Sequence, residues 1–244
     1  MKGLRYERLD TLRALAIVWM AAFHFCFDLN YFGLWQPPQL FTRDPFWTTQ
    51  RSCIVALFLF CAGLGQAVAL HGRSGWPLLD RGFWRRWGQV AAGALLVSAG
   101  SALMFPRSWI HFGVLHGIAV MLIAVRLLAP LRSGLWPLGA VALALPLWLQ
   151  HPVFDNPWAN WVGLVTRKPI TEDYVPVLPW LGVMLWGLAA GQVLLQHRPD
   201  LLSGPVPAAL RPLAVLGRWS LSFYMLHQPL LIGVLMAGRS LGWW

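Results

Sequence analysis

The chain has 244 residues, of which 57% are hydrophobic and 11% charged, and its mean hydropathy is +0.56. This composition excludes a soluble globular protein and predicts an all-α, polytopic membrane helix bundle, because helices satisfy their own backbone hydrogen bonds in lipid. The net charge of +10 is accompanied by no nucleic-acid-binding pattern, so we expect the lipid bilayer and no nucleic acid as a partner.

Seven apolar stretches approach the roughly 20 residues that a transmembrane helix needs. In chain order, the predicted spans are residues 12–32, 53–70, 88–105, 112–129, 135–150, 177–195 and 214–237. The fifth is short and contains Pro137 and Pro146, which favour a kink. Since no Gly/Ser-rich or Pro-rich linker divides these stretches, we expect residues 1–244 to form one transmembrane domain.

The Lys and Arg residues of the loops and of the adjoining span ends predict the orientation, because such residues gather on the cytoplasmic side. With a cytoplasmic N-terminus, that side holds twelve of them: Lys2, Arg5, Arg8, Arg73, Arg81, Arg85, Arg86, Arg126, Arg132, Arg198, Arg211 and Arg218. The opposite side holds six: Arg43, Arg51, Arg107, Arg167, Lys168 and Arg239. The sequence therefore predicts an N-in, C-out arrangement.

Two long outer segments, residues 34–52 and 151–176, are rich in Pro and Trp. Trp residues that alternate with polar side chains suit stacking on sugar rings and hydrogen bonding to hydroxyl groups. The alternative is an interfacial lid whose Trp side chains rest among lipid headgroups. The sequence leaves both interpretations open.

Three ionisable residues share one face of the first predicted span. Arg13 and His24 are eleven positions apart, which is three helical turns plus about 20° and roughly 16 Å along the axis. Asp28 follows His24 at i+4. Ionisable groups inside an apolar helix usually face the bundle interior or a wet cavity, so this face is the predicted functional site.

Each of these three residues has a functional and a structural interpretation. His24 suits a general base or an acyl-accepting nucleophile, with Asp28 orienting the imidazole. The alternative is a histidine that only packs between helices. Arg13 either binds the phosphates of a cytosolic cofactor or simply pairs with Asp10 and reaches the headgroups.

The remaining histidines are less specific. His111 and His116 lie about 140° apart on a helix and do not face one ligand together. His227 and Gln228 precede Pro229, which opens a polar notch in a helix, although a kink with a satisfied histidine explains them as well. No metal-binding spacing joins His24, His116 and His227, so we expect no metal.

The segment RLDTLRALAIVWMAAFHFCFDLNYFGL resembles the opening of the bacterial membrane proteins grouped with the catalytic domain of heparan-alpha-glucosaminide N-acetyltransferase. Its Arg-x10-His spacing is similar to that of acyltransferase family 3. Further segments that resemble this group surround Arg51, surround His111 and His116, and begin at Asp173 and at Gly217.

The resemblance implies an enzyme of the bacterial inner membrane. It would transfer an acetyl group from cytosolic acetyl-CoA to a sugar or glycan hydroxyl or amine on the extracytoplasmic side, as a monomer or a homo-oligomer. The implied catalytic residues are His24 and Asp28. The implied cofactor-binding residues are Arg13, Arg81, Arg85 and Arg86, and the implied substrate-positioning residues are Arg51, His116, His227 and Gln228. The alternative is a non-enzymatic transporter or envelope-pathway subunit that uses the same polar face for binding.

Overall fold

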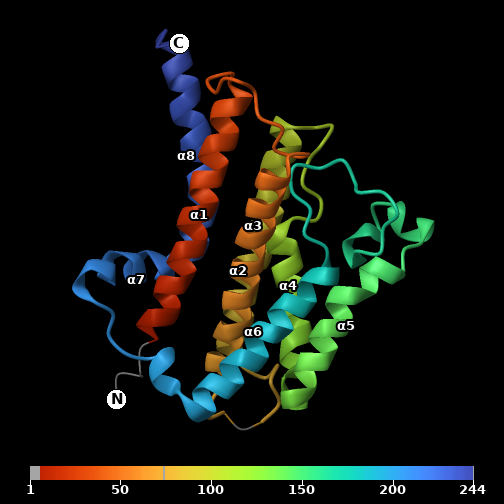
Figure 1. Ribbon diagram of the computed structural model, residues 1–244, viewed down its shortest axis with the longest axis vertical. Coiled ribbons are helices and arrows are strands. Elements are labelled where there is room, and N and C mark those ends of the chain that lie inside the picture. Colours follow the sequence, from red (N-terminus) through yellow and green to blue (C-terminus); the bar gives the residue numbers. More distant parts are fainter. Residues whose placement is uncertain (1–5, 74, 244) are drawn as a thin grey trace. The chain divides into compact units, whose positions relative to one another are not determined.

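The computed structural model describes residues 6–73 and 75–243, and the regular elements among them are all helical (Figure 1). Lys2 and Arg5, two of the basic residues counted above, lie outside the described residues. The chain divides into two compact units. Unit 1 comprises Met1–Phe58 and Asp200–Trp244, and unit 2 comprises Leu59–Pro199. The single domain expected from the sequence stays a prediction.

The long helices agree with the predicted spans in number and order. They are α1 (Glu7–Tyr31), α2 (Pro45–Leu70), α3 (Arg81–Met104), α4 (Val114–Leu128), α5 (Leu135–Trp148), α6 (Val177–His197) and α8 (Ser220–Ser240). By length and composition, six helical stretches of the described chain could cross a membrane, with α4 and α5 taken together as Val114–Trp148. The prediction of an all-α membrane protein with about seven spans is confirmed.

The connection between α4 and α5 is the short 3-10 helix η1 (Ala129–Gly134). Within it, Arg132 has φ 46° and ψ −110°, a conformation that a residue with a Cβ atom adopts only at a cost. The chain reverses direction there, and α5 then packs along α6 (Figure 1). The division of this stretch into two predicted spans was therefore correct.

Two predicted helix starts were wrong. Helix α2 begins at Pro45 rather than at residue 53, because Asp44 caps it: the Phe46 N–H donates to Asp44 Oδ1 at 2.8 Å, and proline suits the first turn. Helix α3 begins at Arg81 rather than at residue 88, because Asp80 caps it in the same way. Arg51 therefore lies within α2 and not in an outer segment.

The last predicted span, residues 214–237, was also wrong in its extent. The structure has two helices there, α7 (Arg211–Arg218) and α8, which meet at Trp219. Helix α7 packs closely on α1, since a Cβ atom on Gly217 would lie 1.8 Å from the Asp10 carbonyl oxygen. Only a glycine allows this approach, and the chain must bend after it to let α8 run along α1.

The core of unit 1 lies between α1, α7, α8 and the first half of α2. Its buried residues are Ile17, Met20 and Ile54. Partly buried side chains pack around them, namely Phe23, Phe58, Leu216, Phe223 and Tyr224. Helices α1 and α8 run in the same direction in Figure 1, as the first and last of an odd number of spans should.

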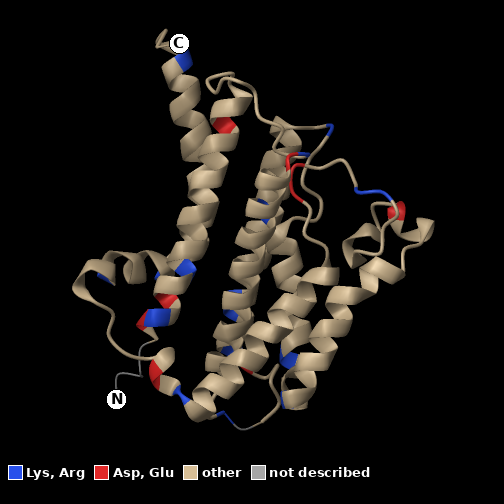
Figure 2. Cartoon of the chain, in the orientation of Figure 1, with Lys and Arg blue, Asp and Glu red and all other residues tan. Residues whose placement is uncertain are grey.

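In unit 2, α2 and α6 approach each other through small residues. A Cβ atom on Gly63 would lie 2.2 Å from the Met184 carbonyl oxygen, and one on Gly187 would lie 2.2 Å from the Phe60 carbonyl oxygen. In a membrane the hydrophobic effect does not drive helices together, because lipid is as apolar as their side chains. Helices there associate through close packing, and small residues allow their backbones to approach. No charged residue lies in the middle of α5 or α6, as the colouring in Figure 2 shows.

Candidate functional site

The candidate site lies in unit 1, where α1 and α8 bring two histidines together. Nδ1 of His24 lies 2.7 Å from Nε2 of His227. The two rings are nearly parallel, with an interplanar angle of 10° and centroids 5.0 Å apart. His227 is buried and His24 is half-buried. The sequence singled out both residues but did not predict that they pair.

The hydrogen bonds around this pair define which nitrogen of His24 is basic. Nδ1 of His227 lies 2.7 Å from the Tyr224 carbonyl oxygen, and a carbonyl only accepts, so that nitrogen carries the hydrogen. When both imidazoles are neutral, Nε2 of His227 therefore accepts and Nδ1 of His24 donates. This arrangement leaves the lone pair of His24 on Nε2, the atom that can take a proton or attack an acyl group.

Asp28 and Gln228 form a second polar pair beside the histidines. Nε2 of Gln228 donates to both carboxylate oxygens of Asp28, at 2.9 and 3.1 Å. Asp28 was expected to orient His24, but its hydrogen-bond partner in the described chain is Gln228, and His24 is instead bonded to His227. Oε1 of Gln228 is buried and has no protein partner among the described residues. That oxygen is a free acceptor for a donor group on a ligand.

Arg13 lies on the same helix as His24 and is held by a neighbour. Its Nη1 is 3.0 Å from Oδ1 of Asp10, and its side chain is 28% exposed. The pairing with Asp10, one of the two alternatives from the sequence, is therefore present. Because α1 is unbroken between the two residues, Arg13 and His24 are separated by roughly 16 Å along the axis.

His116 belongs to unit 2 and has a local structural role there. The Gly113 N–H donates to its Nδ1 at 3.3 Å, so Nε2 carries the hydrogen and contacts Ser98 Oγ at 3.1 Å. Ser98 Oγ in turn donates to the Ile110 carbonyl oxygen at 2.6 Å. Both ring nitrogens are thus occupied at the start of α4, and the predicted substrate-positioning role of His116 stays a prediction.

The other predicted arginines are exposed. Arg51 lies on the unit 1 part of α2, and Arg81, Arg85 and Arg86 lie on the first turns of α3 in unit 2. Exposed guanidinium groups at a helix start remain accessible to a phosphate-bearing ligand.

Sequence reasoning missed Arg126, which it counted only as a cytoplasmic cation. This side chain is 2% exposed in the last turn of α4. Its Nε donates to Gln66 Oε1 at 2.8 Å, its Nη1 donates to the Pro77 carbonyl oxygen at 2.7 Å, and its guanidinium stacks 4.0 Å from the Phe83 ring centroid. The available signal was its position inside the predicted span 112–129, where an ionisable residue predicts a polar site.

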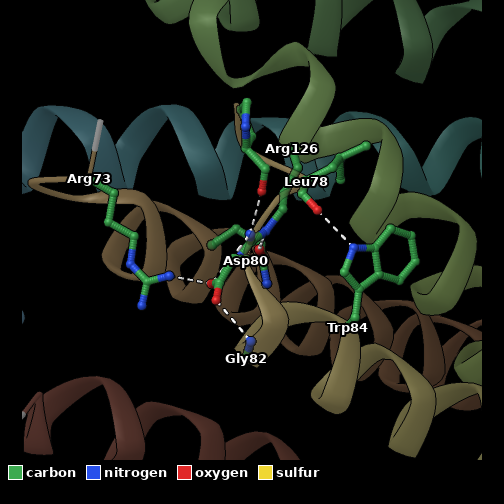
Figure 3. A network of polar contacts seen from close by, with 8 residues as sticks. Arg73, Leu78, Asp80, Gly82, Trp84 and Arg126 are labelled. Carbon is green, nitrogen blue, oxygen red and sulfur yellow. Dashed lines mark hydrogen bonds and ion pairs between the residues drawn. The ribbon is translucent and has the colours of Figure 1, made fainter. Parts of the chain in front are cut away.

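Asp80, the residue that caps the start of α3, also forms an ion pair with Arg126 (Figure 3). Its carboxylate forms an ion pair with Arg73, lies 3.7 Å from Nη1 of Arg126, and accepts from the Gly82 N–H at 2.9 Å. Burial acts to raise the pKa of Asp80, but the Gly82 N–H and the two guanidinium groups together hold that pKa below its usual range. The carboxylate is therefore the ionised centre of the network.

The lowered pKa of Asp80 predicts how stability depends on pH. Because its pKa is lower in the folded state, its stabilising contribution is complete above the ordinary Asp pKa and is lost as pH falls through the folded value. We expect Asp80→Asn, which keeps an oxygen for the helix cap, to show a smaller loss of stability on acidification than the wild type. Thermal unfolding in detergent from about pH 7 to about pH 3 tests this. Identical pH profiles for the two proteins would contradict it.

Among residues 6–73 and 75–243, no cluster of three or more His, Cys, Asp or Glu side chains has the arrangement of a metal site.

The fold and the site together define an integral membrane protein with a hydrogen-bonded imidazole pair in its helix bundle. The chain belongs to the family described as heparan-alpha-glucosaminide N-acetyltransferase, catalytic, which matches residues 5–229. This membership indicates a transferase and suggests a membrane acetyltransferase. Comparison with curated proteins and with solved structures gave no match.

Proposed function

We propose that the protein transfers an acetyl group from cytosolic acetyl-CoA to a sugar or glycan hydroxyl or amine on the extracytoplasmic side of a bacterial inner membrane. The observation that carries the proposal is the His24–His227 pair at 2.7 Å, which leaves Nε2 of His24 basic. Family membership supports the acetyltransferase class, and the basic residues near the predicted cytoplasmic helix ends support the orientation.

In the proposed reaction, Nε2 of His24 takes the proton of the acceptor hydroxyl or amine as its oxygen or nitrogen attacks the thioester carbonyl. The bond from carbonyl carbon to sulfur then breaks, and the coenzyme leaves as a thiolate that receives the proton. In the alternative sequence, Nε2 attacks the thioester carbonyl and the coenzyme leaves as a thiolate; the acceptor hydroxyl or amine then attacks the acetyl-imidazole, which releases Nε2, and the acceptor's proton passes to the thiolate. In both sequences His227 holds the tautomer that keeps Nε2 basic.

The neighbouring polar groups have supporting roles in this proposal. Asp28 holds Gln228, whose free Oε1 accepts a hydrogen bond from the acceptor substrate. Arg13, roughly 16 Å towards the predicted cytoplasmic end, binds a phosphate of acetyl-CoA. Further contacts to the donor and the acceptor are proposed for Arg81, Arg85, Arg86, Arg51 and His116.

Binding of acetyl-CoA to the detergent-purified protein tests the donor side. We expect Arg13→Ala to weaken the affinity roughly tenfold, the size of one lost charge-assisted hydrogen bond, as measured by calorimetry. Arg43→Ala, which removes an exposed arginine on the predicted outer side of unit 1, should leave the affinity unchanged. Asp10→Asn should keep or increase the affinity, because it releases Arg13 from its ion pair.

Equal acetyl-CoA affinity for Arg13→Ala and the wild type would remove the role proposed for Arg13. Failure of the folded wild-type protein to bind acetyl-CoA at all would instead favour the non-enzymatic transporter or envelope-pathway subunit.

A further inference from the structure

Unit 2 contains a cavity of about 1130 Å³. It lies where α2, α4 and α6 end and where α3 and α5 begin, together with η1. The charged residues that line it are Arg73, Asp80, Arg126 and Arg132. Its volume lies just above the roughly 300–1,000 Å³ of typical small-molecule sites.

The charges that line the cavity do not balance. Arg73 and Arg126 share the single carboxylate of Asp80 (Figure 3), and Arg132 adds a third guanidinium group to the lining. The described lining therefore has an excess of two positive charges. Low-dielectric walls concentrate such a field and attract an anion.

The central arginine of the cavity is fixed before any ligand arrives. Arg126 is held by Gln66, by the Pro77 carbonyl and by the Phe83 ring. The segment that carries Pro77 and Asp80 is itself tied to α3, since Trp84 Nε1 donates to the Leu78 carbonyl oxygen at 2.7 Å. A guanidinium group that is already ordered loses little entropy when it binds a ligand.

Two other residues of the lining have features that favour a ligand. Arg132 is in the costly φ 46° conformation, and such residues concentrate where structures clamp ligands. Oε1 of Gln192 is buried and has no protein partner among the described residues, whereas its Nε2 donates to the Ala129 carbonyl oxygen at 3.0 Å. An amide oxygen in that state accepts from an N–H or O–H group of a ligand.

We propose that this cavity binds a phosphate ester. The phosphate lies against Arg132 and Arg73 in the positive field of Arg126, and a donor group of the ligand bonds to Oε1 of Gln192. Trp76 and Trp136, which also line the cavity, provide flat apolar surfaces for the organic part. This chemistry is shared by an anionic phospholipid headgroup and by a soluble nucleotide, and the inference does not rest on acetyl transfer.

The test uses the full chain in phospholipid nanodiscs and has two arms. In the soluble arm, ADP is titrated into protein in phosphatidylcholine nanodiscs and its binding is measured by calorimetry. In the lipid arm, retention of phosphatidylglycerol over phosphatidylcholine is measured by native mass spectrometry. Binding in the first arm identifies a soluble ligand, and selective retention in the second identifies a lipid.

The variants separate this site from general charge effects. We expect Arg132→Gln to weaken the observed binding roughly tenfold, and Arg132→Lys to retain most of it. The matched control Arg107→Gln removes an exposed arginine beyond the opposite end of α3 and should leave binding unchanged. Absence of binding in both arms, or equal weakening by Arg107→Gln, would overturn the proposal.

Discussion

Replacing His24 with alanine is expected to abolish acetyl transfer while the protein remains folded and inserted in the membrane. The change removes Nε2, the proposed base, and general base catalysis contributes about 100-fold to 10,000-fold in rate. Turnover of acetyl-CoA with a glycan acceptor, in protein reconstituted into vesicles, measures the effect. A melting transition that stays cooperative and falls by no more than about 10 °C would show that chemistry, and not folding, is lost.

A second His24 variant separates the base from the hydrogen bond. His24→Ala leaves Nε2 of the buried His227 without its partner, which costs about 1–3 kcal/mol. His24→Asn places an amide N–H where Nδ1 was, so it can still donate to His227 although it is no base. We expect His24→Asn to be as inactive as His24→Ala but more stable. Wild-type activity in either variant would contradict the proposed mechanism.

His227 provides the matching test of positioning. If it fixes the tautomer of His24, His227→Ala should lower kcat and alter its pH dependence while the KM for acetyl-CoA is unchanged. A histidine that only packed between α1 and α8 would affect stability and leave the pH profile as it was. These two readouts distinguish a positioning residue from a structural one.

Replacing Gly187 with valine is expected to prevent unit 2 from folding. A Cβ atom there would lie 2.2 Å from the Phe60 carbonyl oxygen and 2.9 Å from the carbonyl carbon. Both are backbone atoms of α2, so no flexible side chain can move aside. We expect even Gly187→Ala to cost about 3 kcal/mol or more, measured as loss of monodisperse protein in detergent and as a lower melting temperature.

The matched control is Gly100→Ala in α3, where a Cβ atom would meet nothing within 4 Å. The same substitution should there be neutral, or should stabilise the protein by up to about 1 kcal/mol through helix propensity. A Gly187→Ala protein as stable as the wild type would mean that α2 and α6 do not approach through their backbones.

Much of the fold follows from sequence alone, because hydropathy and backbone hydrogen bonding act locally. A stretch of apolar residues must be helical in lipid wherever its neighbours lie, so the number and order of helices were predictable. The early starts of α2 and α3 were also encoded, in Asp44-Pro45 and in Asp80, but both lie ahead of the apolar stretches from which the spans were predicted. The break at Trp219 depended instead on the contact between Gly217 and α1, which a local pattern does not contain.

The sequence by itself determined a membrane helix bundle and the chemical groups available to it, including His24, Asp28, His227 and Gln228. Only the tertiary structure decided which groups meet. His24 bonds to His227, 203 positions away, while Asp28 bonds to Gln228 and not to the histidine one turn below it. Helical periodicity determines which residues of one helix share a face, but the rotation and register of two packed helices depend on the close contacts between them, such as those of Gly217 and Gly187.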